Sequence, residues 1–124
     1  EILARIVSTS VQGCKADTMG LGPIGASKKA LERAKLTIND IDIVELNEAF
    51  ASQSLACIKD LQIDPNKVNI DGGALALGHP LGATGARITG KAAQILRREN
   101  KKYALATQCI GLGMGIATII ESVK

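Results

Sequence analysis

Three residues whose side chains can exchange protons or donate hydrogen bonds lie where one expected element passes to the next. Asn47 follows the apolar run 41–46, His79 precedes a helical pattern, and Cys109 ends a β-rich run. In open α/β sheets, sites are built at such strand ends. The three residues are therefore candidates for one functional site.

Each of these residues also has a structural interpretation. An asparagine before a helix is often an N-cap, and a strand cysteine is often a small apolar core residue. A lone histidine is often a hydrogen-bonded structural residue. The chain has one histidine and three cysteines without a CxxC pair, so it offers no zinc site. Reduced thiols in a cytosolic type of compartment are the natural interpretation, and we expect a cytoplasmic protein.

The elements that position these residues follow from hydrophobic periodicity. We expect strands over residues 2–11, 41–46, 68–70, 103–110 and 115–122. We expect helices beginning at Pro23, over 49–61, and from the end of a glycine-rich loop (72–82) to about Arg98. The last two strands should pair as a hairpin, because their connection is too short for a parallel crossover. The sequence therefore predicts an α/β domain with a mixed five-stranded sheet covered by helices, in the order βαβαβαββ.

Two of these helices show which side should be buried. The second should turn Phe50, Ser54, Cys57, Ile58 and Leu61 inward, and the third should bury Ile88, Ala92, Ile95 and Leu96.

Length and composition exclude several classes of partner. The 124 residues are one domain's worth, with 46% hydrophobic residues, 22% charged residues and a net charge of +3. One Tyr, one Phe and no Trp leave no platform for base stacking, so we expect no nucleic acid partner. The apolar runs are too short for a membrane span, and we expect no membrane partner. Because the chain begins with Glu1 rather than Met, we expect it to be a piece of a longer protein.

Two glycine patterns imitate nucleotide sites. Residues 20–25 match GxGxxG, with Glu45 further on at a strand end, but residues 12–19 separate the first glycine from the expected strand. A dinucleotide site needs that glycine directly after the strand. Residues 85–91 match GxxxxGK, but Ala92 stands where a magnesium-binding Ser or Thr is required. Neither pattern predicts a nucleotide site.

Four segments together resemble the signature blocks of thiolases, in the family's order and at about its spacing. They are Asn-Glu-Ala-Phe at 47–50, Gly-Gly-Ala-Leu-Ala-Leu-Gly-His-Pro-Leu-Gly-Ala-Thr-Gly-Ala-Arg at 72–87, Cys-Ile-Gly-Leu-Gly-Met-Gly at 109–115, and Met-Gly-Leu-Gly-Pro-Ile at 19–24. The resemblance spans nearly the whole chain. It implies that residues 1–124 are the C-terminal domain of an acetyl-CoA acetyltransferase or 3-ketoacyl-CoA thiolase, one half of the thiolase fold.

The resemblance also implies an acyltransferase of lipid metabolism that makes or cleaves a carbon–carbon bond through an acyl-cysteine, with coenzyme A and acetyl-CoA as substrates and no bound cofactor. Cys109 would exchange the α-proton. His79, and Asn47 through a water molecule, would hold the thioester oxygen, while the backbone N–H of Gly111 would serve the acyl-enzyme carbonyl. Met19 would line the acyl pocket.

The resemblance has two departures and one missing part. Family members usually have Asn where Asp71 stands and Gly where Leu112 stands. The nucleophilic cysteine and the loop domain that binds CoA belong to the family's N-terminal part, and neither Cys14 nor Cys57 can replace that nucleophile. We therefore expect this chain alone to be inactive, with the N-terminal thiolase half as its partner and a homo-oligomer as the assembled state.

Three alternatives remain open. A ketoacyl synthase would use two histidines, and this chain has one. A degenerate relative that binds acyl-CoA without turnover would fit the departure at Leu112. A dehydrogenase would fit the GxGxxG pattern. Chain-length preference and the direction of the reaction are not encoded in these residues.

Overall fold

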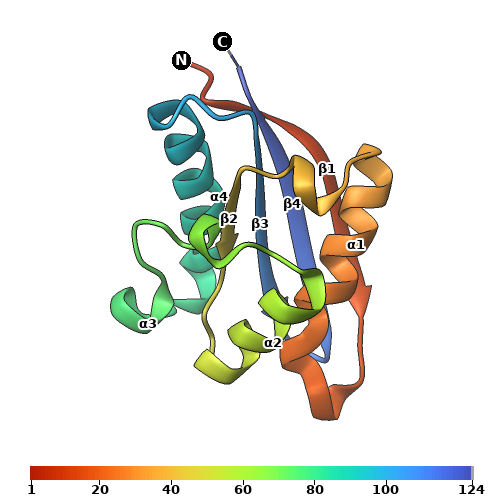
Figure 1. The fold of residues 1–124 in the computed structure, drawn as a ribbon. Coiled ribbons are helices and arrows are strands. Elements are labelled where there is room, and N and C mark those ends of the chain that lie inside the picture. The colour runs from red at the N-terminus through yellow and green to blue at the C-terminus, as the bar shows by residue number, and fades with distance from the viewer. Residues whose placement is uncertain (124) are drawn as a thin grey trace.

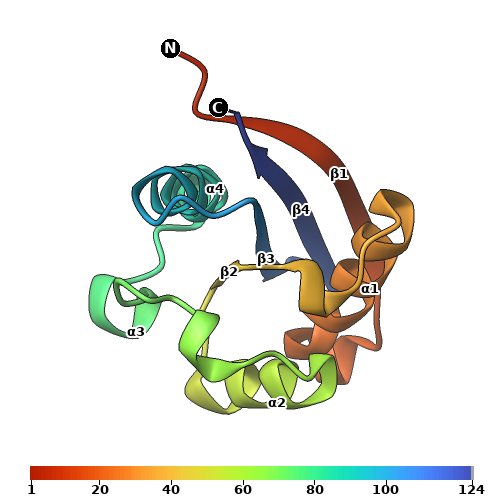
Figure 2. The same cartoon turned by 45° about the horizontal axis from the view of Figure 1, so that its top comes forward.

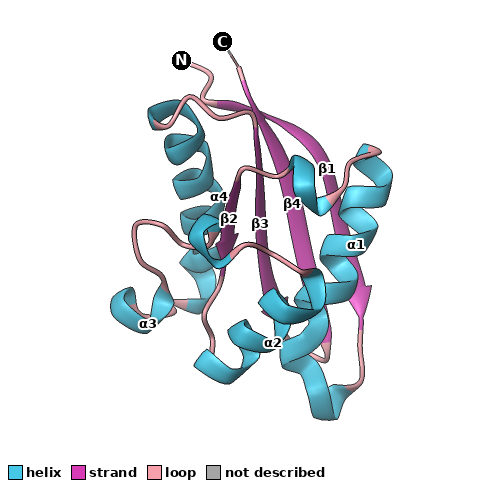
Figure 3. Ribbon diagram, viewed as in Figure 1, coloured by secondary structure: helices cyan, strands magenta, loops and turns pink. Residues whose placement is uncertain are grey.

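The computed structural model describes residues 1–123 as helices packed on both faces of one sheet (Figures 1 and 3). In chain order the strands and α-helices are β1 (Ala4–Gly13), α1 (Gly22–Ala34), β2 (Ile43–Leu46), α2 (Ala51–Leu61), α3 (Ala74–Leu77), α4 (Leu81–Arg98), β3 (Tyr103–Ile110) and β4 (Met114–Ser122). Short 3₁₀ segments at Ala16–Leu21, Ile38–Asp40 and Pro65–Lys67 complete the set.

The strands of the described part form a mixed sheet in the order β1-β4-β3-β2. β3 and β4 pair antiparallel as the expected hairpin, with Ile110 opposite Met114 at its turn. β1 pairs antiparallel with β4, and β2 pairs parallel with β3. The C-terminal ends of β2 and β3 therefore meet at one end of the sheet, the end that carries Asn47 and Cys109. Figure 1 shows both termini at the opposite end.

The two faces of the sheet bury separate cores (Figure 2). α1 and α2 cover one face, where Ala30, Leu46, Cys57, Leu105 and Ile119 are buried together. α4 covers the other face beside β2 and β3 and buries the expected stripe. In this second core, Ala92, Ile95 and Leu96 of α4 pack against the strands. The strand residues are Ile43 of β2, Ala104 of β3 and Ile120 of β4. The amphipathic period of α4 thus predicted the face that it buries.

The expected fifth strand over 68–70 is wrong, and the sheet of residues 1–123 has four strands. Val68 makes an isolated parallel bridge with Val44, and the Asn69 N–H donates to the Val44 carbonyl. Asn69 then takes a φ of +46°, which ends the extended backbone. Its side-chain amide bonds both backbone groups of Leu46, at 3.0 and 2.8 Å, in place of a continuing strand.

Two local expectations need correction near the glycine-rich segment and α2. Residues 72–82 contain the short helix α3, which was expected to be loop. Phe50 does not belong to the buried side of α2, because it is the N-cap residue of that helix and its side chain is 71% exposed. Cys57 and Leu61 are buried as expected, whereas Ile58 is only half-buried.

Neither glycine pattern forms a nucleotide-binding loop. Gly22 is the first residue of α1 and packs against the backbone of β4. Glu45 is fully buried on the face of β2 that α4 covers, so it is not available to a ribose. Residues 85–91 lie inside α4. Among the helices of residues 1–123, none is long and apolar enough to cross a membrane.

Candidate active site

The residues singled out from the sequence gather at the end of the sheet where β2 and β3 terminate. An open pocket of about 550 Å³ lies there. Its lining comprises Met19, Gly20, Ala49, Phe50, His79, Leu81, Gln108, Cys109, Ile110 and Gly111. None of these residues carries a permanent charge, and most of the lining is apolar.

Asn47 lies behind this lining rather than in it. The residue directly follows β2, where its backbone N–H donates to the Thr107 carbonyl and its side chain is fully buried. Its Nδ2 is 3.5 Å from Nε2 of His79, while its Oδ1 has no hydrogen-bond partner in the described part of the chain. Asn47 therefore does not cap a helix, and its side-chain amide faces the histidine.

His79 is held from both sides of its ring. The residue lies in the turn between α3 and α4, two positions before the first residue of α4. Its Nδ1 is 2.7 Å from the hydroxyl oxygen of Thr84, a fully buried residue in the first turn of α4. With Nε2 facing Asn47, both ring nitrogens have polar neighbours, and the shorter contact is the one to Thr84.

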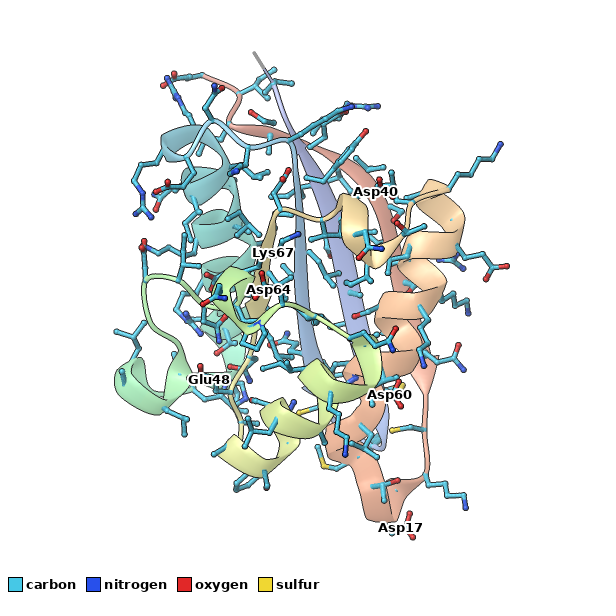
Figure 4. All side chains as sticks on the ribbon, viewed as in Figure 1. Asp17, Asp40, Glu48, Asp60, Asp64 and Lys67 are labelled. Carbon is cyan, nitrogen blue, oxygen red and sulfur yellow. The ribbon has the colours of Figure 1, made fainter. Side chains whose placement is uncertain are left out.

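Glu48 connects the end of β2 to α3, the short helix that precedes His79, through hydrogen bonds. Its carboxylate accepts hydrogen bonds from Nδ2 of Asn69 at 2.8 Å and from the backbone N–H of Leu75 at 3.0 Å. A Cβ on Gly73 would overlap this carboxylate, so only glycine leaves room for it. Figure 4 shows Glu48 between the end of β2 and α3. Glu48 thereby ties α3 and the end of β2 to each other.

Cys109 is a buried thiol at the end of β3. Burial raises the pKa of Cys109 above its ordinary value, the opposite of the lowering that an activated thiol needs. Within residues 1–123 the group is therefore kept as a thiol, which is the form that donates a proton. Gly111 follows in the β3–β4 turn, where an added Cβ would meet nothing within 4 Å.

The structure shows the surroundings of Leu112 and Asp71, the two residues that differ from the usual family pattern. Leu112 takes a φ of +64°, the left-handed region that a glycine would also use, so the turn closes between Ile110 and Met114. Asp71 accepts hydrogen bonds from Arg98 at 2.7 and 2.8 Å and lies 2.6 Å from the Lys91 ammonium. Its charge is neutralised by α4 rather than directed at His79.

Sequence reasoning missed several members of the site. Thr84, Leu81, Phe50 and Gln108 were not singled out, although all except Gln108 lie within the blocks that carried the resemblance. A usable signal for Thr84 was its place one helical turn after the Pro80 that caps α4. Met19 lines this pocket from the 3₁₀ segment before α1, and its expected contact with an acyl chain stays a prediction.

Fold and site together define an α/β domain with a histidine, a thiol and a buried amide gathered at one end of the sheet. The family model described as "Thiolase, C-terminal domain" matches residues 1–122, and this chain belongs to the thiolase family.

Named relatives agree with this assignment. The 3-ketoacyl-CoA thiolase of Shewanella loihica is 56% identical over 123 residues, which are 97% of this chain and 32% of that protein. The 3-ketoacyl-CoA thiolase of Vibrio cholerae is 55% identical over 123 residues, again 97% of this chain and 32% of that protein.

Solved structures show the same relation. A crystal structure of human mitochondrial 3-ketoacyl-CoA thiolase superposes with a TM-score of 0.98 and 51% identity, covering 100% of this chain and 32% of that chain. A second structure of the human enzyme, in complex with CoA, matches equally well. This chain spans about a third of the length of these relatives.

Proposed function

We propose that this chain is the C-terminal third of an acyltransferase that cleaves 3-ketoacyl-CoA with CoA, or forms it by condensation on acetyl-CoA, through an acyl-cysteine. The observation that carries the proposal is the convergence of His79, Cys109 and Gly111 on one uncharged pocket, with Asn47 directly behind His79. The CoA complex of the human relative supports CoA as the substrate class.

His79 and Asn47 would stabilise the oxygen of the substrate thioester. As the carbon next to that carbonyl gains or loses a proton, negative charge develops on the oxygen, and donors already in place lower the barrier. Nε2 of His79 and Nδ2 of Asn47 point to the same region, 3.5 Å apart. A water molecule held by the Asn47 amide would supply the second donor.

Cys109 would exchange the proton at the α-carbon. In cleavage its thiol protonates the carbanion that departs when the carbon–carbon bond breaks, and the resulting thiolate takes a proton from the incoming CoA thiol. The raised pKa that burial gives Cys109 keeps the group protonated before the first step and makes the resulting thiolate a stronger base for the second. The backbone N–H of Gly111 would bind the carbonyl oxygen of the acyl-enzyme, and Met19 would contact the acyl chain.

The nucleophile that carries the acyl group would come from an N-terminal half packed on the open face of the sheet. α4 leaves part of that face uncovered near β1 (Figure 2), and the apolar side chains of Ile6 and Val11 are exposed there. Burying such side chains against a second layer is favourable. We further propose a homo-oligomer in the cytoplasm with a role in lipid metabolism. The three free cysteines of the described residues support the reducing compartment.

The test uses a hybrid enzyme in which this chain replaces the aligned third of the Shewanella loihica thiolase. We expect the hybrid to consume acetoacetyl-CoA or a longer 3-ketoacyl-CoA in the presence of CoA, measured as loss of the 3-ketoacyl thioester absorbance. The isolated 124-residue chain should show no turnover. His79→Ala in the hybrid should lower kcat about 10²- to 10³-fold. A folded but inactive hybrid, beside an active parent relative, would overturn the proposal.

A further inference from the structure

Thr84 holds a hydroxyl against the ring nitrogen of His79 that faces away from the pocket. Its Oγ1 is 2.7 Å from Nδ1 of His79 and 3.1 Å from the carbonyl oxygen of Pro80, and the residue is fully buried. A hydroxyl donates one proton and can also accept one, so two arrangements are open: Thr84 donates to an unprotonated Nδ1, or it donates to Pro80 and accepts the proton of an Nδ1–H group. The direction in which the hydroxyl proton points decides which nitrogen of the neutral imidazole carries the ring proton.

The carbonyl oxygen of Pro80 already accepts two backbone hydrogen bonds. Its oxygen accepts the backbone N–H of Ala83 at 2.9 Å and that of Thr84 at 3.0 Å, and a carbonyl oxygen has two lone pairs. Nδ1 of His79 has no other hydrogen-bond partner among residues 1–123, and it is the closer of the two acceptors. The Thr84 hydroxyl is therefore expected to donate to Nδ1 of His79 and not to the Pro80 carbonyl.

We infer that Thr84 donates to Nδ1 of His79 and so holds the neutral ring in the tautomer that carries its proton on Nε2. This inference rests on the proposed function only for its consequence in catalysis. Thr84 does not touch the pocket, since it is absent from its lining. It is a positioning residue, which acts on the substrate through His79.

The tautomer decides whether His79 can serve a developing oxyanion. With the proton on Nε2, His79 and the Nδ2 of Asn47 are two donors 3.5 Å apart, and they cannot bond each other. An oxygen atom placed beside the two donors can then accept a hydrogen bond from each of them. With the proton on Nδ1, the lone pair of Nε2 accepts one N–H of the Asn47 amide, so His79 offers no donor and Asn47 keeps only its second N–H. One hydroxyl on α4 thus keeps the donor pair available.

The first test reads the tautomer directly. His79 is the only histidine of the 124-residue chain, so ¹⁵N-histidine labelling gives one pair of ring nitrogen signals. At a pH where the ring is neutral, we expect Nδ1 to show the shift of an unprotonated nitrogen and Nε2 that of an N–H. Thr84→Val, which keeps the shape and removes the hydroxyl, should raise the Nδ1–H population, and Thr84→Ser should not.

The second test measures turnover in the hybrid enzyme. Thr84→Val should lower kcat about 10- to 100-fold, by analogy with the loss of a residue that orients a metal-ligating histidine. KM should change little, and Thr84→Ser should stay close to the unmodified hybrid. The Nδ1–H tautomer in the unmodified chain, or an unchanged tautomer balance in Thr84→Val, would overturn the inference. The tautomer of the unmodified chain can be read without enzyme activity and without the valine variant, so this measurement still tests the inference if the proposed function fails.

Discussion

Gly22 in the first turn of α1 and Gly115 near the start of β4 pack backbone against backbone. A Cβ on Gly115 would overlap the carbonyl group of Gly22, and a Cβ on Gly22 would lie 2.5 Å from the Met114 carbonyl oxygen. Gly115 also pairs with Cys109 across the β3–β4 hairpin. The close approach therefore sets the distance between α1 and the strand end that carries the candidate acid–base thiol.

This contact predicts that Gly115→Ala destabilises the domain. The added methyl group meets backbone, which cannot move aside as a side chain can, and overpacking of this kind typically costs about 1–3 kcal/mol. Urea unfolding of the 124-residue chain measures the loss. The control is Gly90→Ala in the middle of α4, where a Cβ meets nothing within 4 Å. That change should stabilise the helix by about 0.5–1 kcal/mol, and equal effects of the two changes would contradict the prediction.

Replacing Leu112 by glycine should stabilise the chain. Leu112 holds a φ of +64°, and the left-handed region costs an L-residue with a side chain about 1–2 kcal/mol that glycine does not lose. Its side chain is 96% exposed, so the change removes little packing within residues 1–123. Part of the gain is lost to the greater freedom of glycine in the unfolded state. We expect a higher urea midpoint at an unchanged m-value, and a lower midpoint would refute the argument.

Glu45 should make stability fall as the pH rises. Burial raises the pKa of Glu45 from 4.5 to about 7, although the charges of Arg87 and Lys91 oppose the shift. The folded state then holds a proton that the unfolded state has lost. Stability therefore decreases between about pH 4.5 and pH 7 and stays lower above that range.

Glu45→Gln tests this directly, because the amide does not titrate. The stability of the variant relative to the unmodified chain should improve by about 3 kcal/mol between pH 4 and pH 8, the value of a shift of this size. Urea unfolding at a series of pH values measures the difference. A constant difference across the range would show that Glu45 is ionised in the folded chain.

Asp71→Asn should destabilise the chain at neutral pH. Hydrogen bonds from Arg98 and Lys91 hold the pKa of Asp71 well below its usual range, so the ionised carboxylate stabilises the fold above the unfolded-state pKa. That contribution is lost as the pH falls through the folded-state pKa, and the deficit of the variant should shrink in acid and in 1 M salt. Asp60→Asn, which breaks only the exposed pair with Lys28, is the matched control and should have little effect. Figure 4 labels Asp60 on α2.

Cys109→Ala should strongly reduce turnover of the hybrid enzyme while leaving the fold intact. The change removes the only group in the pocket lining, apart from His79, that can exchange a proton. General acid–base catalysis contributes typically about 10²- to 10⁴-fold, and we expect kcat to fall by that factor. Cys57→Ala serves as the control, because Cys57 is buried in the core between α2 and the sheet. It should lower stability and keep turnover, and a Cys109→Ala hybrid with normal kcat would remove Cys109 from the mechanism.

The sequence by itself determined the elements whose periodicity is strong and the residues that carry the family's blocks. The stripe of Ile88, Ala92, Ile95 and Leu96 identified α4 and its buried face, because a helix period repeats over many turns. The short connection between residues 110 and 114 was enough to predict a hairpin. The blocks around Asn47, His79 and Cys109 were enough to predict the family.

Only the tertiary structure decided how these residues relate to one another. Residues 68–70 look like a strand, but the positive φ of Asn69 and its side-chain bonds to Leu46 end the pairing after one bridge. The burial of Glu45 depends on α4, which lies far along the chain. The direction of one hydroxyl proton on Thr84 depends on how many donors Pro80 already has. Local patterns reflect what each segment prefers alone, whereas these properties arise from contacts between segments that are distant in the sequence.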